Sequence, residues 1–118
     1  MIDRTFAQRF ALEWVDSWNS HDLDRVLAHY AEEFEMTSPF IVEWMGEPSG
    51  HLKGKDKIRP YWAKGLNTNP PLRFELERVF VGVDSITIEY RRLGTDTKAA
   101  EALFFDSALK VIRGVAHY

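Results

Sequence analysis

Apolar residues recur at helical spacing early in the chain and again after residue 55. The first predicted helix runs from residue 3 to about residue 18, where aromatic residues recur every four positions as Phe6, Phe10, Trp14 and Trp18. A polar stretch at 19–22 supplies caps for a second, shorter helix, whose apolar face carries Leu23, Val26, Leu27 and Tyr30. A third helix starts no earlier than about residue 56, ends near 67–71 and has Pro60 in its first turn. Its apolar positions are Ile58, Tyr61, Trp62 and Leu66.

The remaining segments show the two-residue alternation of β-strands. Residues 34–38 alternate and end at Pro39, and four further strands are predicted at Leu72–Val81, Ser85–Arg92, Lys98–Phe105 and Leu109–Tyr118. Their short connections favour an antiparallel meander. Residues 46–55 form the most loop-like stretch. The segment is either a lid that Gly46, Gly50 and Gly54 allow to move or an ordinary connection.

Helices that precede a run of strands predict the α+β class, with helices covering one face of a strongly bent sheet. The 118 residues fit one domain over 1–118. No apolar run is long enough to span a bilayer, and the 15 lysines and arginines form no basic block, so we expect neither membrane nor nucleic acid as a partner. The chain lacks cysteine and an apparent signal peptide, which favours a cytoplasmic location.

Three stretches in this order carry a family resemblance. They are WNSHDLD at 18–24 leading to YAEEF at 30–34, GKDKIRPYW at 54–62, and the closing FFD at 104–106 with KVIR at 110–113. Together they resemble the SnoaL-like group of the nuclear transport factor 2-like superfamily, which includes ketosteroid isomerase. The resemblance implies a cone-shaped α+β barrel, with three helices wrapped by a curved mixed sheet around a pocket. Its members include isomerases, cyclases, hydrolases and plain binding domains, so the fold alone does not assign a function.

Similarity to ketosteroid isomerase also implies which strand faces line the pocket. The implied rows are Phe34, Met36 and Ser38; Ile86, Ile88 and Tyr90; Ala99, Glu101, Leu103 and Phe105; and Ile112, Gly114, Ala116 and Tyr118. The helices would add Trp14, Tyr30, Tyr61 and Trp62. Nearly all of these residues are apolar or aromatic, so a small hydrophobic molecule is the expected partner.

Glu101 is the one carboxylic acid in these rows. Strand pairing predicts Gly114 opposite it on one side and Ile88 or Tyr90 on the other, without a compensating cation. Burial would then raise its pKa, making it a candidate catalytic acid or base, as the protonated Asp of ketosteroid isomerase is a neutral donor. Alternatively, Glu101 bonds a tyrosine hydroxyl, or Arg92 turns inward and neutralises it.

Two other positions depart from the isomerase pattern. The residue matching the catalytic base is Ser38, whose hydroxyl cannot accept a proton without an activating base. The residue matching the phenol donor is Trp14, whose indole N–H can donate but cannot cycle a proton. Steroid isomerisation is therefore not expected.

Two hypotheses remain open at this point. One is a ligand-binding domain without catalytic machinery. The other is an enzyme acting on a small hydrophobic carbonyl, epoxide or polyketide-like substrate with Glu101 as acid or base. A protein-interaction adaptor is a third reading that no residue specifically supports. His21, His29, His51 and His117 show no paired metal-ligand spacing, so neither metal nor other cofactor is expected.

The opposite face of the sheet predicts a symmetric partner. Apolar residues alternate with the pocket row there and would be buried if two subunits paired their sheets as a homodimer: Val79, Val81, Val111 and Val115, with His117 beside them.

Overall fold

The computed structural model describes residues 1–118 and contains four helices and six strands. Their bounds are α1 (Arg4–Asn19), α2 (Leu23–Leu27), β1 (Tyr30–Thr37), α3 (Pro39–Met45), β2 (His51–Lys53), α4 (Lys55–Leu66), β3 (Phe74–Val81), β4 (Ser85–Arg92), β5 (Lys98–Phe105) and β6 (Val111–His117). The predicted α+β class is confirmed. The structure has one helix more than the three expected.

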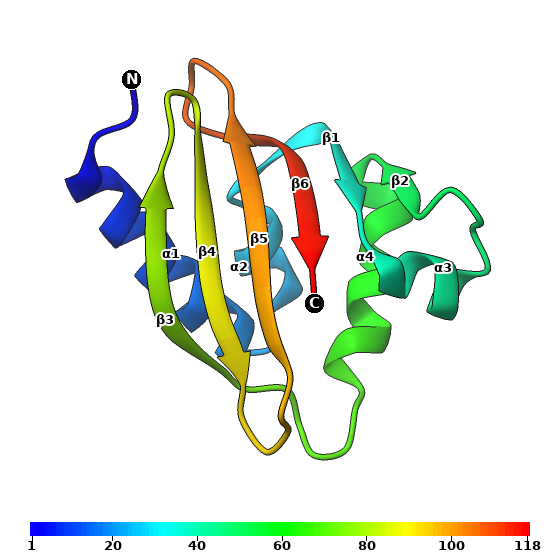
Figure 1. Cartoon of the computed structure of the whole chain (residues 1–118). Helices are drawn as coiled ribbons and strands as arrows, with labels where there is room; N and C mark the ends of the chain where they lie inside the picture. The colour runs from blue at the N-terminus through cyan, green and yellow to red at the C-terminus, as the bar shows by residue number, and fades with distance from the viewer.

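The six strands form one curved sheet in the order β2-β1-β6-β5-β4-β3. The pair β1–β6 is parallel and all other pairs are antiparallel, as expected for a mixed, mostly antiparallel sheet. The sheet does not close, because β2 and β3 remain its two edges. Helices α1 and α2 lie behind the sheet in Figure 1, and α4 lies beyond β1 and β6.

Helix α1 confirms the prediction made from the four-residue aromatic repeat. Asp3 caps its start by accepting a hydrogen bond from the backbone N–H of Phe6 at 2.7 Å. Phe10, Trp14 and Trp18 are each at most 8% exposed and pack on the sheet. None of the four helices combines the length and apolar character needed to cross a membrane.

The second helix is shorter than predicted, and Tyr30 belongs to a strand. Helix α2 ends at Leu27, and the backbone of His29 already accepts a hydrogen bond from the N–H of Val111 at 2.9 Å. Pairing with β6 therefore extends β1 back to Tyr30, four residues before the predicted start.

The unpredicted helix is α3, which follows β1 directly. Ser38 is its N-cap, with its Oγ accepting from the N–H of Phe40 at 3.2 Å, and Pro39 occupies the first turn. Gly46 ends the helix with φ of 65°. We predicted only a turn at Pro39, although Ser-Pro is also a signal for a helix start.

The segment 46–55 is not one loop. Its second half forms strand β2, which pairs with β1, and α4 begins at Lys55. Backbone hydrogen bonds from Ser38 to Gly50 at 2.9 Å and from Gly54 to Phe34 at 2.8 Å fasten the segment. Pro60 lies in the second turn of α4 rather than its first, where it has no N–H to offer the carbonyl of Asp56.

The four-strand meander is confirmed, but two bulges change which side chains face inward. One bulge lies between Leu76 and Arg78 and the other between Phe104 and Phe105. As a result, Val79 and Val111 are buried in the core and Val81 packs against it, instead of facing outward. Ile112, predicted to face the pocket, is 42% exposed for the same reason.

The register also differs from the prediction at the candidate acid. Glu101 pairs with Ala116, whereas Gly114 pairs with Leu103. The other neighbour of Glu101 is Ile88, as predicted. The inward direction of Glu101 does not change, because a shift of two residues keeps a side chain on the same face.

Candidate functional site

A cavity of about 110 Å³ lies between helices α1, α3 and α4 and the concave face of the sheet. It opens near the β4–β5 turn, which lies at the lower end of the molecule in Figure 1, beside the end of α4. Twelve of its 17 lining residues are hydrophobic, so its walls are mainly apolar. The lining comprises Trp14, Trp18, Met36, Phe40, Trp44, Tyr61, Trp62, Gly65, Leu72, Phe74, Tyr90, Arg92, Thr95, Thr97, Ala99, Glu101 and Tyr118.

Seven of the predicted site residues line this cavity. They are Trp14, Met36, Tyr61, Trp62, Tyr90, Glu101 and Tyr118, and they come from six different parts of the chain. Tyr118 is half exposed and packs on Phe40 with ring centroids 4.3 Å apart. The structure brings these side chains together around one space, and their role towards a ligand stays a prediction.

Six predicted residues do not line the cavity. Ile88 and Leu103 are fully buried in the core, and Ala116 lies beside Glu101 on the neighbouring strand. Gly114 is covered by Met36, whose Sδ would lie 2.9 Å from a Cβ added at this glycine. The remaining two, Tyr30 and Ser38, make hydrogen bonds inside the protein.

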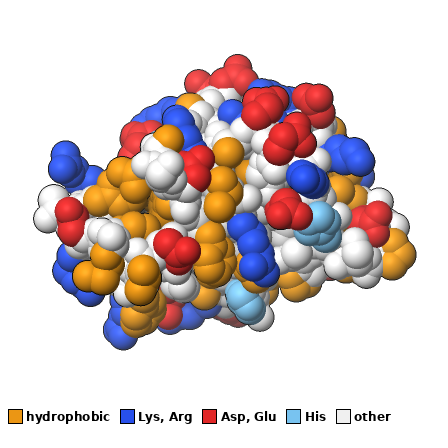
Figure 2. Space-filling model, turned by 90° about the horizontal axis from the view of Figure 1, so that it is seen from above, with side chains coloured by type: hydrophobic (Ala, Val, Ile, Leu, Met, Phe, Trp, Pro, Cys, Tyr) orange, Lys and Arg blue, Asp and Glu red, His pale blue; other side chains and the backbone are white.

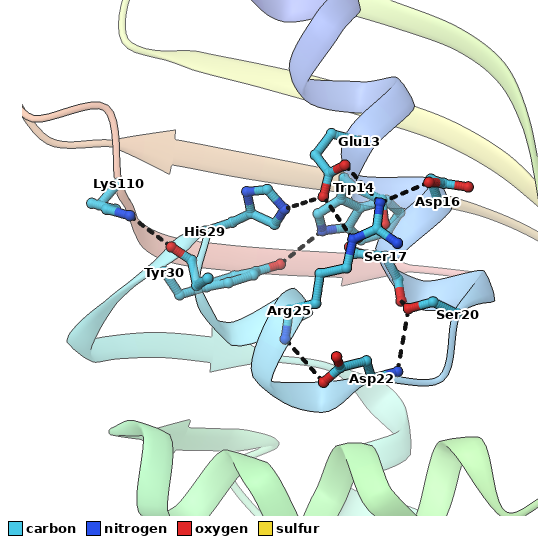
Figure 3. Close-up of polar contacts among 11 residues, drawn as sticks. Glu13, Trp14, Asp16, Ser17, Ser20, Asp22, Arg25, His29, Tyr30 and Lys110 are labelled. Carbon is cyan, nitrogen blue, oxygen red and sulfur yellow. Dashed lines mark hydrogen bonds and ion pairs between the residues drawn. The ribbon is translucent and has the colours of Figure 1, made fainter.

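Tyr30 is tied to the first helix. The indole Nε1–H of Trp14 donates to the Tyr30 hydroxyl at 2.9 Å, and Figure 3 shows this contact between α1 and the start of β1. Burial raises the pKa of Tyr30 above its usual range. The same view shows Arg25 bridging Glu13 and Asp16, each at 2.7 Å, on the outer side of α1. The Tyr30 hydroxyl thus accepts the hydrogen bond of the Trp14 N–H, which leaves this indole without a donor for a ligand.

Ser38 is likewise occupied. Its hydroxyl accepts from the Tyr61 hydroxyl at 2.9 Å as well as capping α3. Burial raises the pKa of Tyr61 to about 12, so this phenol is neutral near pH 7 and activates nothing. Ser38 therefore fixes the geometry of α3 and α4, which is a structural role.

Glu101 lines the cavity as an uncharged acid. It is 6% exposed, and its carboxyl group forms neither a hydrogen bond nor an ion pair within the protein. Burial in apolar surroundings raises its pKa to about 8. The predicted bond to a tyrosine hydroxyl is not formed. Arg92 does not neutralise it either, because Tyr90 stands between their positions on the inner face of the sheet.

Arg92 belongs to the open end of the cavity. Its Nη2 donates to Thr68 Oγ1 and to the carbonyl of Pro70 at 3.5 Å, which holds the guanidinium against the loop after α4. Thr95 and Thr97 in the β4–β5 turn line the same end. The cavity therefore has an acid on one strand and a cation nearer to its opening.

The sequence analysis did not include several residues that line the cavity, although the sequence pattern indicates most of them. Trp18 lies four residues after Trp14 on the same helix face, and Arg92 continues the alternation of Ile88 and Tyr90. Phe40 and Trp44 stack with ring centroids 4.6 Å apart, but they depend on the unpredicted helix α3.

The histidines lie apart and have different contacts. His21 contacts the Leu72 carbonyl at 2.7 Å, His29 contacts Glu13 at 3.3 Å and His51 contacts Glu35 at 3.0 Å. No group of three or more His, Asp or Glu side chains is arranged to hold a metal ion.

Comparison with known proteins gives a consistent fold family. The family model described as the SnoaL-like domain matches residues 11–118. A SnoaL-like protein of unknown function from Burkholderia thailandensis is 46% identical, with 99% of this chain and 97% of that chain covered and a TM-score of 0.93. No curated protein matches the chain.

Two more distant structures share the fold. A protein with a cystatin-like fold from Methylobium petroleophilum is 19% identical, with a TM-score of 0.76 over 99% of this chain and 78% of that chain. TerC, co-crystallised with polyporic acid, is 16% identical, with a TM-score of 0.74 over 91% of this chain and 86% of that chain.

The pKa of Glu101 predicts how stability depends on pH. Between the unfolded pKa of 4.5 and the folded pKa of about 8, the folded state keeps a proton that the unfolded state has lost. Stability therefore falls as pH rises through this interval, by at most about 5 kcal/mol. Urea denaturation of wild type and Glu101→Gln should show the variant gaining stability relative to wild type as pH rises.

Glu89→Gln is the matched control, because Glu89 lies on the outer face of the adjacent strand. Its stability difference from wild type should stay nearly constant across this interval. A Glu101→Gln difference that is equally flat would show that the Glu101 carboxyl is solvated.

Proposed function

The chain belongs to the SnoaL-like domain family, and we propose that it binds a small, largely apolar molecule in the cavity that contains Glu101. One observation carries the proposal: a buried carboxyl group without any protein partner lines a cavity with aromatic walls. A protein core normally pairs its polar groups, since an unpaired buried one costs about 1–3 kcal/mol. A ligand oxygen would accept the hydrogen bond that neutral Glu101 can donate.

The cavity size limits the ligand. An engineered apolar cavity of roughly 150 Å³ takes up benzene, so a space of about 110 Å³ suits a single ring or a short branched chain. A longer molecule would extend past the exposed Thr95 in the β4–β5 turn. TerC, which has the same fold, was co-crystallised with the organic molecule polyporic acid, and this supports the proposal by analogy only.

Binding without catalysis fits the polar groups best. Ser38 already accepts from Tyr61 and Phe40, and the Trp14 N–H already donates to Tyr30. Glu101 is thus the one proton-transfer candidate among the three positions that resemble those of ketosteroid isomerase.

An enzymatic function is the second candidate, favoured by the pKa of Glu101 near neutrality. An acid with such a pKa can exchange protons readily at physiological pH. Acting as a base, ionised Glu101 would remove a proton from the carbon next to a substrate carbonyl and return one to it.

We also propose that the chain forms a homodimer through the outer face of the sheet and resides in the cytoplasm. The apolar strip on this face differs from the one predicted, because the bulges turn Val79 and Val111 inward. It consists of the half-buried Ala100, Ala102, Phe104 and Val115. Arg113 stacks over the Phe104 ring at 5.3 Å, so the strip is partly polar.

A cavity-filling substitution tests the binding proposal. Ala99 lines the cavity, so Ala99→Leu should reduce the binding of benzyl alcohol at least about tenfold, measured by tryptophan fluorescence. Ala102→Leu, on the outer face of the same strand, should leave binding unchanged. Thermal unfolding checks that both variants fold. Equal binding by both variants would remove the cavity as the site.

Hydrogen exchange separates binding from catalysis. We expect the wild type not to accelerate deuterium incorporation into the methyl group of acetophenone in D₂O, measured by NMR. Acceleration that rises as pH passes about 8 and is lost in Glu101→Gln would instead assign Glu101 as a catalytic base.

Sedimentation tests the dimer. The wild type should sediment as a dimer, and Phe104→Asp should sediment as a monomer, because a carboxylate would be buried in the interface. Leu109→Asp is the control, since Leu109 is an exposed apolar residue in the β5–β6 turn. A monomeric wild type would refute the proposal.

The end of the molecule that carries the β5–β6 turn shows both acidic and basic side chains around its hydrophobic ones (Figure 2).

A further inference from the structure

Two hydrogen-bond donors of the cavity lining are left without an acceptor. The indole Nε1 of Trp18 is buried and unpartnered, and this side chain is only 6% exposed. The Nε of Arg92 is also buried and unpartnered. By contrast, the other indole of α1 in this cavity donates to Tyr30. The indole N–H of Trp14 thus has an acceptor within the protein, whereas that of Trp18 has none.

The positive charge of Arg92 is not paired with a carboxylate of the protein. Its Nη2 is held by Thr68 and Pro70, which are neutral acceptors, and it forms no ion pair. Its neighbour Arg91 has an unpartnered Nε as well, but that side chain points to the outer face, 3.2 Å from Glu75 and 3.9 Å from Glu77. Arg91 therefore has carboxylates nearby, whereas Arg92 has none.

Phe74 links the two open donors. It is the cross-strand partner of Arg92, and its ring lies 5.9 Å from that of Trp18. Arg92 and Trp18 are therefore both neighbours of one aromatic residue, and all three line the cavity. A group bound beside Phe74 would lie near both N–H donors.

The charge of the lining favours an anion there. Arg92 and Glu101 are its only ionisable residues apart from tyrosines. Because burial keeps Glu101 protonated near neutral pH, the lining carries one net positive charge. A carboxylate is well suited to this end, since its two oxygens can accept from the guanidinium and the indole together.

We propose that the ligand is a small aromatic carboxylate, whose ring lies among the cavity aromatics and whose carboxylate accepts hydrogen bonds from Arg92 Nε and Trp18 Nε1. This inference rests on the proposed binding function and specifies its ligand class. The ligand ring would pack on the aromatic side chains of the lining, and the cavity volume of about 110 Å³ fits one ring. The neutral acid Glu101 donates to a polar substituent elsewhere on the ligand.

The test compares benzoate with benzamide, its neutral analogue, by isothermal titration calorimetry. Wild type should bind benzoate about tenfold or more tightly than benzamide, because a charge-assisted hydrogen bond is the stronger one. Arg92→Met should weaken benzoate binding about ten- to a hundredfold and remove the preference. Trp18→Phe keeps an aromatic ring but removes the indole N–H, and it should weaken benzoate binding less than Arg92→Met does.

Arg91→Met is the matched control, since it removes the same charge from the adjacent position on the outer face. It should bind both probes as wild type does. The comparison of the two probes on wild type does not depend on any variant folding. Equal binding of both probes by wild type, or an equal loss in Arg91→Met and Arg92→Met, would overturn the inference and leave the binding function intact. Failure of benzoate, benzamide and benzyl alcohol to bind would overturn both.

Discussion

The desolvation of Glu101 is the constraint on which the site depends. Antiparallel pairing with Ile88 and Ala116 holds this residue on the concave face, where no cation reaches it. Its proton is thus retained through the cost of burying a charge, rather than through a specific partner. Such a group is uncharged near neutral pH and can donate a hydrogen bond into an apolar space. Its exposure to water would remove this property, so the walls of the cavity matter as much as the acid.

Those walls are kept in place by polar contacts outside the cavity. Asn19, at the end of α1, exchanges two hydrogen bonds with the backbone of Phe74, at 2.9 and 2.7 Å. This side chain acts as a short strand partner and fixes where β3 begins. Ser38 performs a similar task by joining α3 to Tyr61. The helices can therefore leave a space between themselves and the sheet, because their ends are tied to it.

Much of this arrangement could be predicted from residue periodicity. Alternation along β5 grouped Glu101 with Leu103 on one face of the strand, and the repeat in α1 gave the apolar face of that helix. The resemblance to ketosteroid isomerase then implied that these faces line the pocket. The bulges at Leu76/Arg78 and Phe104/Phe105 could not be predicted, because each depends on pairing between strands. They explain why Ile112 faces outward and Val111 inward. Helix α3 was missed for a different reason: seven residues give too short a pattern to outweigh a proline.

Arg92 and Glu101 lie apart in the cavity, so its two ends differ in charge. Arg92 lies four residues beyond Ile88, the partner of Glu101, which corresponds to about 13 Å along the strand. An ion pair between them would have cancelled both charges and satisfied both groups. With Tyr90 between them, the cation and the neutral acid instead face the same space from different points. A molecule in this space therefore meets a positive donor and a neutral donor, which favours one orientation over its reverse. For the proposed ligand, selectivity for orientation would thus follow from the spacing of two residues on neighbouring strands, within a fold that by itself specifies no ligand.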